Sequence, residues 1–226
     1  MSIAEQILRA KEDYDAVYEA GKQAESGAFW DKFQDYGNRT NWRNGCSGEG
    51  WDDENFTPKY PFVTVDAYMM FTRSKITHLP IEVDFSTAET IQYCFWNCKN
   101  LLELPIIKAT NGQLYGTFNG CNALHTIEKI ILPPAERQGS NWFNSAFDNC
   151  NSLVSIDFEG VIGQNINFNK SPMLSMASIT SVINALSDTT SGRSVTFSKT
   201  AKEAAFTADE WAALIATKPN WTINLV

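Results

Sequence analysis

Apolar residues recur at a nearly fixed spacing in the middle of the chain, and this recurrence is the strongest pattern in the sequence. Superposing Phe71, Phe95, Phe118 and Phe147 aligns four segments on F-x-x-C-x-x-L-x-x-[LI], with Ser74 replacing the cysteine in a first copy that is one residue short. The steps between the phenylalanines are 24, 23 and 29 residues, and leucine-rich repeats measure about 20–29 residues. One such unit cannot bury its own apolar face, so we expect neighbouring units to stack around a shared core.

Stacking predicts columns of equivalent side chains. Besides the phenylalanines, the buried columns are Ile76, Leu101, Leu124 and Leu153; Leu79, Leu104, Ile127 and Ile156; and Ser74, Cys98, Cys121 and Cys150. Cysteine in the last column is expected to act as a compact apolar residue with a weak donor at a tight turn. A zinc site is not predicted, because it needs about four converging ligands and the chain has only 2 His. No metal or cofactor is expected.

The first 25 residues have the pattern of a helix with a heptad seam. Ile3, Ala10 and Val17 fall at position a, and Ile7 and Tyr14 fall at position d. Two interpretations remain open. The seam packs on the chain's own domain as one amphipathic helix, or it joins copies of the chain in a parallel coiled coil, for which a homotrimer is one expected state. An isolated helix of this length is marginal in water, so the seam must be buried against something.

The flanking segments complete an expected division into four parts. Residues 26–65, rich in aromatic residues, are expected to cap the open end of the repeats in residues 66–175. In residues 176–226 the pattern predicts a helix over 178–187 and a strand over 194–198. A capping box at Thr207 and Glu210 predicts a helix through Ile215, followed by a strand over 221–226. The fold class predicted is an α/β repeat: a short, irregular leucine-rich-repeat solenoid with an N-terminal helical stalk and a helix-containing C-terminal cap.

The repeat resembles a known family. The unit is similar to the BspA-like class of leucine-rich repeats, and Ala146 to Cys150 and Leu101 to Pro105 carry the resemblance best. The stretch from Phe29 to Thr40 and the C-terminal tail also resemble parts of such proteins from gut bacteria, their prophages and phages. The resemblance implies an adhesive or virion-attachment role, and it supplies no catalytic residues.

Composition and charge exclude several classes of protein. The formal net charge is -8, which argues against nucleic-acid binding and against docking on an anionic membrane. No stretch reaches the roughly 20 apolar residues of a membrane helix. The first 25 residues lack the apolar core of a signal peptide. We therefore expect synthesis in the cytoplasm and, after assembly, association with a virion. Motifs for catalytic triads, phosphate loops and dinucleotide sites are missing from the sequence, so no enzyme is predicted.

A binding role is the remaining prediction. Trp96 is the sharpest candidate, because an exposed tryptophan points to a partner, and Trp142 in the long final repeat is the second. On the strand side, the candidates are His78, Glu103, Glu128 and Asp157. An ordinary solvated face is the competing interpretation of these positions.

Three roles are compatible with this reading. The preferred one is a phage or prophage virion protein, of the tail- or head-fibre type, that recognises a host surface. It would bind a virion or cell-surface protein through the N-terminal helix and a host glycan or protein through the repeats. The alternatives are a bacterial surface adhesin and a cytoplasmic protein-interaction scaffold.

Overall fold

The computed structural model describes residues 45–52, 62–63, 66–79, 83–189 and 191–226. The N-terminal heptad, with Ile3, Ile7, Ala10, Tyr14 and Val17, lies outside these residues, as does most of the expected aromatic cap. The described strands are β1 (Phe62–Val63), β2 (Val83–Asp84), β3 (Glu103–Lys108), β4 (Thr126–Ile131), β5 (Ser155–Glu159), β6 (Ile166–Phe168), β7 (Arg193–Phe197) and β8 (Trp221–Leu225). The helices are α3 (Met176–Ala185), α4 (Lys199–Ala205), α5 (Ala208–Ile215) and the 3-10 turn η1 (Ala135–Arg137). No helix among these elements has the length and apolar character needed to span a membrane.

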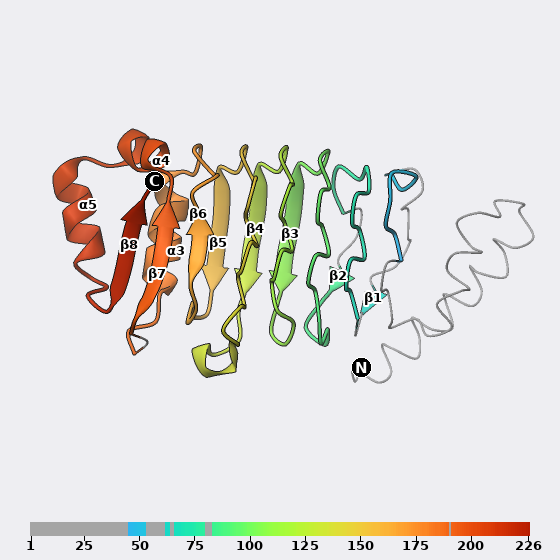
Figure 1. The fold of residues 1–226 in the computed structure, drawn as a ribbon, viewed down its shortest axis with the longest axis horizontal. Coiled ribbons are helices and arrows are strands. Elements are labelled where there is room, and N and C mark those ends of the chain that lie inside the picture. Colours follow the sequence, from blue (N-terminus) through green and yellow to red (C-terminus); the bar gives the residue numbers. More distant parts are fainter. Residues whose placement is uncertain (1–44, 53–61, 64–65, 80–82, 190) are drawn as a thin grey trace, which may run out of the picture.

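The strands pair in parallel and in chain order. They form a two-stranded sheet β1-β2 and two three-stranded sheets, β3-β4-β5 and β6-β7-β8. Figure 1 shows them side by side along the long axis of the molecule, with α4 and α5 at the C-terminal end. Within the first large sheet, Leu104 lies opposite Ile127, and Ile127 lies opposite Ile156.

The predicted leucine-rich-repeat solenoid is wrong. Such a solenoid carries a strand from every repeat along one horseshoe, whereas the described residues form a mixed α/β fold whose sheets are separate. The first large sheet ends at β5 because α3 covers that strand's free edge. The hydroxyl of Ser178 accepts the backbone N–H of Ile156 at 2.9 Å, and that of Ser181 accepts the N–H of Phe158 at 3.1 Å. Serine hydroxyls thus satisfy the donors that another strand would have paired.

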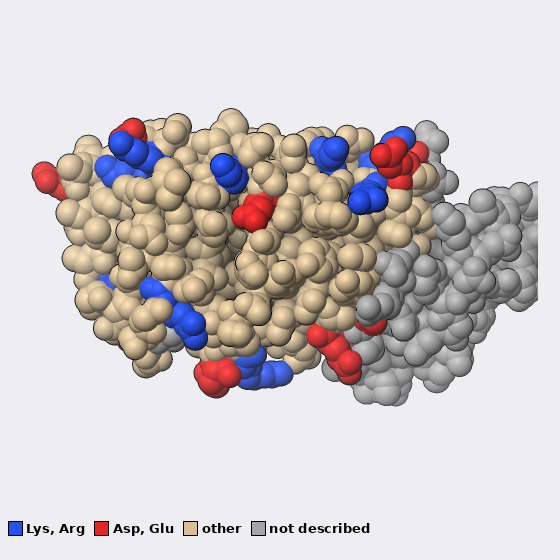
Figure 2. Space-filling view, in the orientation of Figure 1, with Lys and Arg blue, Asp and Glu red and all other residues tan. Residues whose placement is uncertain are grey.

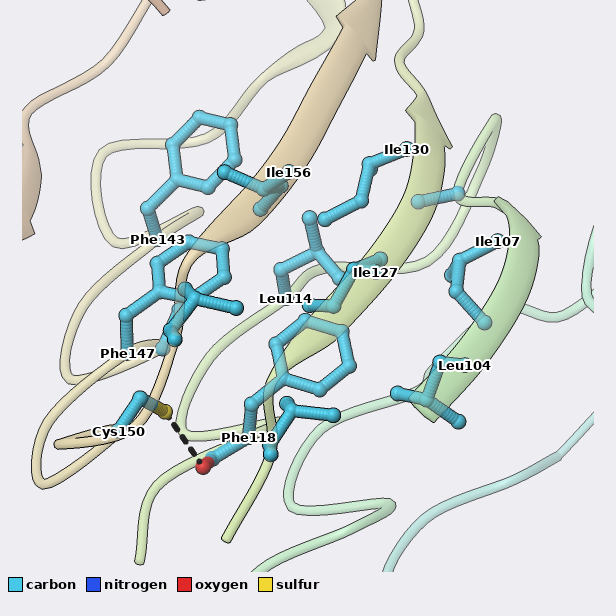
Figure 3. Close-up of a cluster of buried hydrophobic side chains, with 14 of the residues drawn as sticks. Leu104, Ile107, Leu114, Phe118, Ile127, Ile130, Phe143, Phe147, Cys150 and Ile156 are labelled. Carbon is cyan, nitrogen blue, oxygen red and sulfur yellow. Dashed lines mark hydrogen bonds between the residues drawn. The ribbon is translucent and has the colours of Figure 1, made fainter. Parts of the chain in front are cut away.

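The predicted side-chain columns are confirmed. Phe71, Phe95, Phe118 and Phe147 stack in succession with ring centroids 5.3, 5.9 and 5.4 Å apart. The column continues through Phe168 and Phe197, at 4.6 and 6.0 Å. Trp211 of α5 meets the last ring edge-on at 6.1 Å and ends the column. The predicted aliphatic columns are buried beside the rings, as the close-up of Phe118, Phe147, Leu104, Ile127 and Ile156 shows (Figure 3).

The cysteine column is also confirmed. The thiols of Cys98, Cys121 and Cys150 donate to the carbonyls of Phe71, Phe95 and Phe118 at 2.9, 2.9 and 3.2 Å. Ser74 takes the equivalent place in the first segment, with its hydroxyl 3.4 Å from the sulfur of Cys98. The same spacing recurs once more, unnoticed in the sequence, from Phe168 through Ser171 to Leu174, all buried. There the backbone N–H of Ser171 donates to Phe168 at 3.0 Å.

The C-terminal elements follow their predicted order. The helix expected over 178–187 is α3, which buries Ile179, Val182 and Ile183. The strands expected near 194–198 and 221–226 are β7 and β8. Thr207 and Glu210 form the predicted capping box at the start of α5. Two elements were not predicted, namely β6 and α4.

Candidate binding surface

One face of the molecule is built from the turns that surround the stacked phenylalanines. We call it the turn face; it comprises residues 66–74, 90–98, 113–121 and 142–150. In each turn the residues two before and two after the phenylalanine have positive φ: Met69 and Arg73, Tyr93 and Asn97, Gly116 and Gly120, and Ser145 and Asn149. Non-glycine residues rarely adopt this conformation, so its recurrence at equivalent positions marks a specific backbone path.

This backbone path aligns the N–H groups of alternate residues toward the next turn. Tyr93, Phe95 and Asn97 donate to the carbonyls of Tyr115, Thr117 and Asn119 at 3.0, 2.9 and 2.8 Å. Equivalent sets of three join the first turn to the second and the third turn to the fourth. The earlier residues Cys46 and Gly48 donate in the same way to Met70 and Thr72. The turn face is therefore held by a ladder of backbone hydrogen bonds, which fixes the direction of its outward side chains.

Four aromatic side chains gather on the turn face. The rings of Tyr68, Trp96 and Tyr115 meet Tyr93 edge-on, with centroids 6.0, 6.2 and 5.2 Å away. The guanidinium of Arg73 lies over the ring of Trp96, 5.0 Å from its centroid. All four rings are half-buried, so each presents part of its surface to solvent. We call these four residues the aromatic cluster.

Tyr93 is the centre of this cluster. Desolvation by burial, followed by its hydrogen bond with Tyr115 and the electrostatic effects of Tyr115 and Tyr68, raises the pKa of Tyr93 to about 12. The phenol is therefore neutral at physiological pH. A Cβ at Gly116 would come within 2.6 Å of the Tyr93 ring, so the ring lies against the glycine backbone and only glycine leaves room for it.

The centre of the turn face carries no formal charge. Residues 90–97 and 113–120 contain no Asp, Glu, Lys or Arg. Apart from the aromatic residues, their polar side chains are four amides and the hydroxyls of Thr90 and Thr117, and Gln92 donates to Gln113 at 3.2 Å. Figure 2 shows a broad uncharged area in this view, with charged groups mostly toward its margins and acidic and basic groups also nearer its middle. Rings and amides, rather than ion pairs, therefore dominate what this surface offers to a partner.

The strand-side residues that the sequence predicts as binding candidates lie on and beside the sheet β3-β4-β5. Glu103 and Glu128 are exposed, as is His78, whose ring Nδ1 lies 3.0 Å from the hydroxyl of Thr77. Asp157 is half-buried; it accepts a hydrogen bond from Ser181 and lies 3.9 Å from the ammonium of Lys129. The structure thus places these residues on a mixed-charge surface, apart from Trp96.

An open depression of about 830 Å³ follows the junction of α3 and β5. It is lined by Asp157, Phe158, Gly160, Met176, Ala177, Thr180, Ser181, Asn184 and Ala185. Asp157, its only titratable group, is bonded to Ser181. The lining thus supplies no partner for acid–base chemistry at this carboxylate.

Trp142 lies at the start of the fourth turn, but its side chain contributes to neither surface. The sequence placed it in an exposed loop, but its side chain is only 3% exposed and packs in the core. Its backbone N–H donates to Gly139 at 3.0 Å, which turns the chain inward directly after η1. The long insertion before Phe147 therefore adds an aromatic ring to the core instead of presenting one to solvent.

The three tyrosines of the aromatic cluster were missed in the sequence. Tyr68 and Tyr115 lie three residues before a repeated phenylalanine, and Tyr93 lies two before. The alignment therefore held a signal, a tyrosine recurring ahead of the phenylalanine in three of four segments. At the position directly after the phenylalanine, which carries the sequence prediction, Trp96 is the only aromatic residue of the four segments.

The cysteines are poor candidates for chemistry. Cys94, Cys98, Cys121 and Cys150 are buried free thiols, and desolvation raises the pKa of each, to about 12 for Cys98. Thiolates, not thiols, bind metals and attack electrophiles. Within the described ranges, no group of three or more His, Cys, Asp or Glu residues is placed to hold a metal ion.

Comparisons with known proteins identify no relative of the chain. No protein-family model matches it, and neither a curated protein nor a solved structure matches it significantly.

Proposed function

We propose that this chain is a non-catalytic binding protein that recognises a host surface, carried on the virion of a phage or prophage. The observation that supports a recognition role most directly is the aromatic cluster around Tyr93 and Trp96, held by a backbone ladder on a face whose two central turns carry no formal charge. Tyrosine, tryptophan and arginine dominate the residues that contribute most to binding at known interfaces.

The composition of the turn face favours recognition over a merely solvated surface. Tyrosine, asparagine and glycine, with tryptophan and arginine at the strongest contacts, are the residues that antibody paratopes use. The turn face has this mixture in Tyr93, Trp96, Asn97, Arg73 and Gly120. Rings already fixed by packing lose little conformational freedom on binding, so less of the interaction energy is lost to ordering.

The virion setting rests on the sequence. The repeat resembles proteins of gut bacteria, prophages and phages, and the seam of Ile3, Ile7, Ala10, Tyr14 and Val17 suits a helical attachment or an oligomer. A virion protein of this kind would present the same face several times. Repeated presentation raises the overall avidity even where each single contact is weak.

Binding of the full chain to whole bacteria tests the proposal. Fluorescently labelled protein is added to a panel of gut bacterial strains and compared with a variant carrying Trp96→Ala and Tyr115→Ala. A matched control carries Glu103→Ala and Glu128→Ala on the sheet face, where both carboxylates are exposed. We expect saturable binding to particular strains that the turn-face variant loses and the control keeps. Binding to none of the strains, or equal binding by both variants, would reject the recognition role of the turn face.

A further inference from the structure

We infer that the ligand of the turn face is a neutral glycan, lying across the aromatic cluster with its hydroxyls against the neighbouring amides. This inference rests on the proposed function and specifies the chemistry of the partner.

The charge pattern excludes strongly charged ligands. Residues 90–97 and 113–120 supply no charge, and the guanidinium of Arg73 is already placed over the ring of Trp96. A polyanion such as a nucleic acid or a sulfated chain needs a row of cations along its path. The aromatic cluster has no such row of cations. We therefore expect a partner that carries little net charge.

The ring geometry argues against a cationic ligand. A quaternary ammonium group is held where aromatic faces surround an open space. Here the rings of Tyr68, Trp96 and Tyr115 close on Tyr93 edge-on, and Arg73 occupies a position over Trp96. A second cation at this place would meet the guanidinium charge at short range.

The combination of rings and amides fits a sugar. A pyranose ring has apolar C–H faces and a rim of hydroxyls, and each hydroxyl both donates and accepts hydrogen bonds. Tyrosine and tryptophan present an apolar body with a polar tip, while asparagine and glutamine carry a donor and an acceptor in one group. Along the chain, each of the two central turns has an amide on either side of its tyrosine. Gln92 and Gln113 precede Tyr93 and Tyr115, and Asn97 and Asn119 follow them.

The extent of the cluster indicates several linked sugars rather than one. Its rings come from three successive turns, with Tyr68 in the first, Tyr93 and Trp96 in the second, and Tyr115 in the third. Neighbouring turns are joined by direct backbone hydrogen bonds of 2.8–3.0 Å, so the three turns lie side by side. The surface is thus a row of contacts suited to an extended chain.

Calorimetry on the full chain tests the ligand class. The probes are neutral hexasaccharides (cello-, chito-, malto-, manno- and galacto-), the neutral polysaccharide fraction of a strain that binds the protein, heparin as a polyanion, and phosphocholine. We expect at least one neutral probe to bind, with an affinity that changes less than about twofold between low and high salt. Trp96→Ala should weaken that binding about tenfold or more, and Trp96→Phe should weaken it less. Glu203→Ala, at an exposed carboxylate of α4, is the matched control, and circular dichroism of each variant checks that the fold is kept.

A second arm separates the two proposals. Host cells are treated with periodate, which cleaves sugar diols, or with a protease, before labelled protein is added. Loss of binding after periodate alone supports the glycan. Loss after protease alone overturns the glycan and leaves the recognition role intact. Heparin or phosphocholine as the only binding probe, or no binding to any neutral probe, overturns the inference as well.

Discussion

The thiol of Cys121 donates a hydrogen bond to the carbonyl of Phe95, which lies 2.9 Å away in the preceding segment. The same bond recurs from Cys98 to Phe71 and from Cys150 to Phe118. Each cysteine thereby joins its own turn to the ring column of the segment before it. The carbonyls of Phe71, Phe95 and Phe118 also accept a backbone N–H from their own turn, from Ser74, Cys98 and Cys121 respectively. The repeated cysteine therefore adds a second hydrogen bond to each carbonyl in a buried position that has no room for a larger residue.

These thiols make stability sensitive to alkali. Burial raises the pKa of Cys98 and Cys121 in the folded protein, so above the unfolded value, near 9, the unfolded chain loses protons that the folded chain keeps. The stabilisation is complete below that pH, and it falls by about 1.4 kcal/mol per thiol and pH unit as the pH rises toward the folded pKa. Urea unfolding at pH 8, 9 and 10 measures the slope. Cys121→Ala should reduce the slope by the share of one thiol, about 1.4 kcal/mol per pH unit. An unchanged slope would contradict the raised pKa of Cys121 as a cause of the alkaline loss of stability.

The phenylalanine column should respond strongly to truncation. Phe118 stacks between Phe95 and Phe147 and is fully buried. Phe118→Ala removes a ring from both stacks, and we expect a loss of about 3–5 kcal/mol in the free energy of unfolding. Leu102→Ala, at a side chain that is 51% exposed, should change it by less than about 0.5 kcal/mol. Chemical denaturation of both variants gives the comparison, and equal effects would show that the column contributes no special stability.

The left-handed turns should reject Cβ atoms to different degrees. Gly120 has φ +80°, and a Cβ there would collide with the side-chain oxygen of Asn97, whereas Gly192, at φ +67°, has open space around it. Gly192→Ala should therefore cost only the backbone strain, about 1 kcal/mol. Gly120→Ala should cost at least about 1 kcal/mol more, because Asn97 must move. Thermal and urea unfolding of both variants measure the difference, and identical losses would mean that Asn97 yields without cost.

The edge of β5 depends on hydroxyls from α3. Ser178 is buried and accepts the N–H of Ile156, so Ser178→Ala leaves a buried donor without a partner. We expect a loss of about 1–3 kcal/mol. Thr180→Ala on the same helix faces the open depression and should be nearly neutral. Amide hydrogen exchange at Ile156 gives a local measurement, and unchanged protection in Ser178→Ala would reject this account of why the sheet ends.

The candidate site was only partly predictable. Trp96 stood out because it follows a repeated phenylalanine directly, and the structure places it in the aromatic cluster. Its tyrosine neighbours were not found, since Tyr93 reaches Tyr115 only when two turns separated by 22 residues lie side by side. Trp142 was assigned to the surface because no local pattern distinguishes an inward loop from an outward one.

Local and repeated signals in the sequence by themselves determined the ring column, the cysteine ladder, the α5 capping box and the C-terminal strands. Each depends on residues close together in the chain, or on one spacing used several times, so the pattern needs no knowledge of distant contacts. Tertiary structure alone decided where the first large sheet ends and which face carries the aromatic cluster. Those outcomes depend on which edge finds a partner: the donors of β5 meet the serines of α3, and a short segment cannot reveal that competition between a strand and a helix.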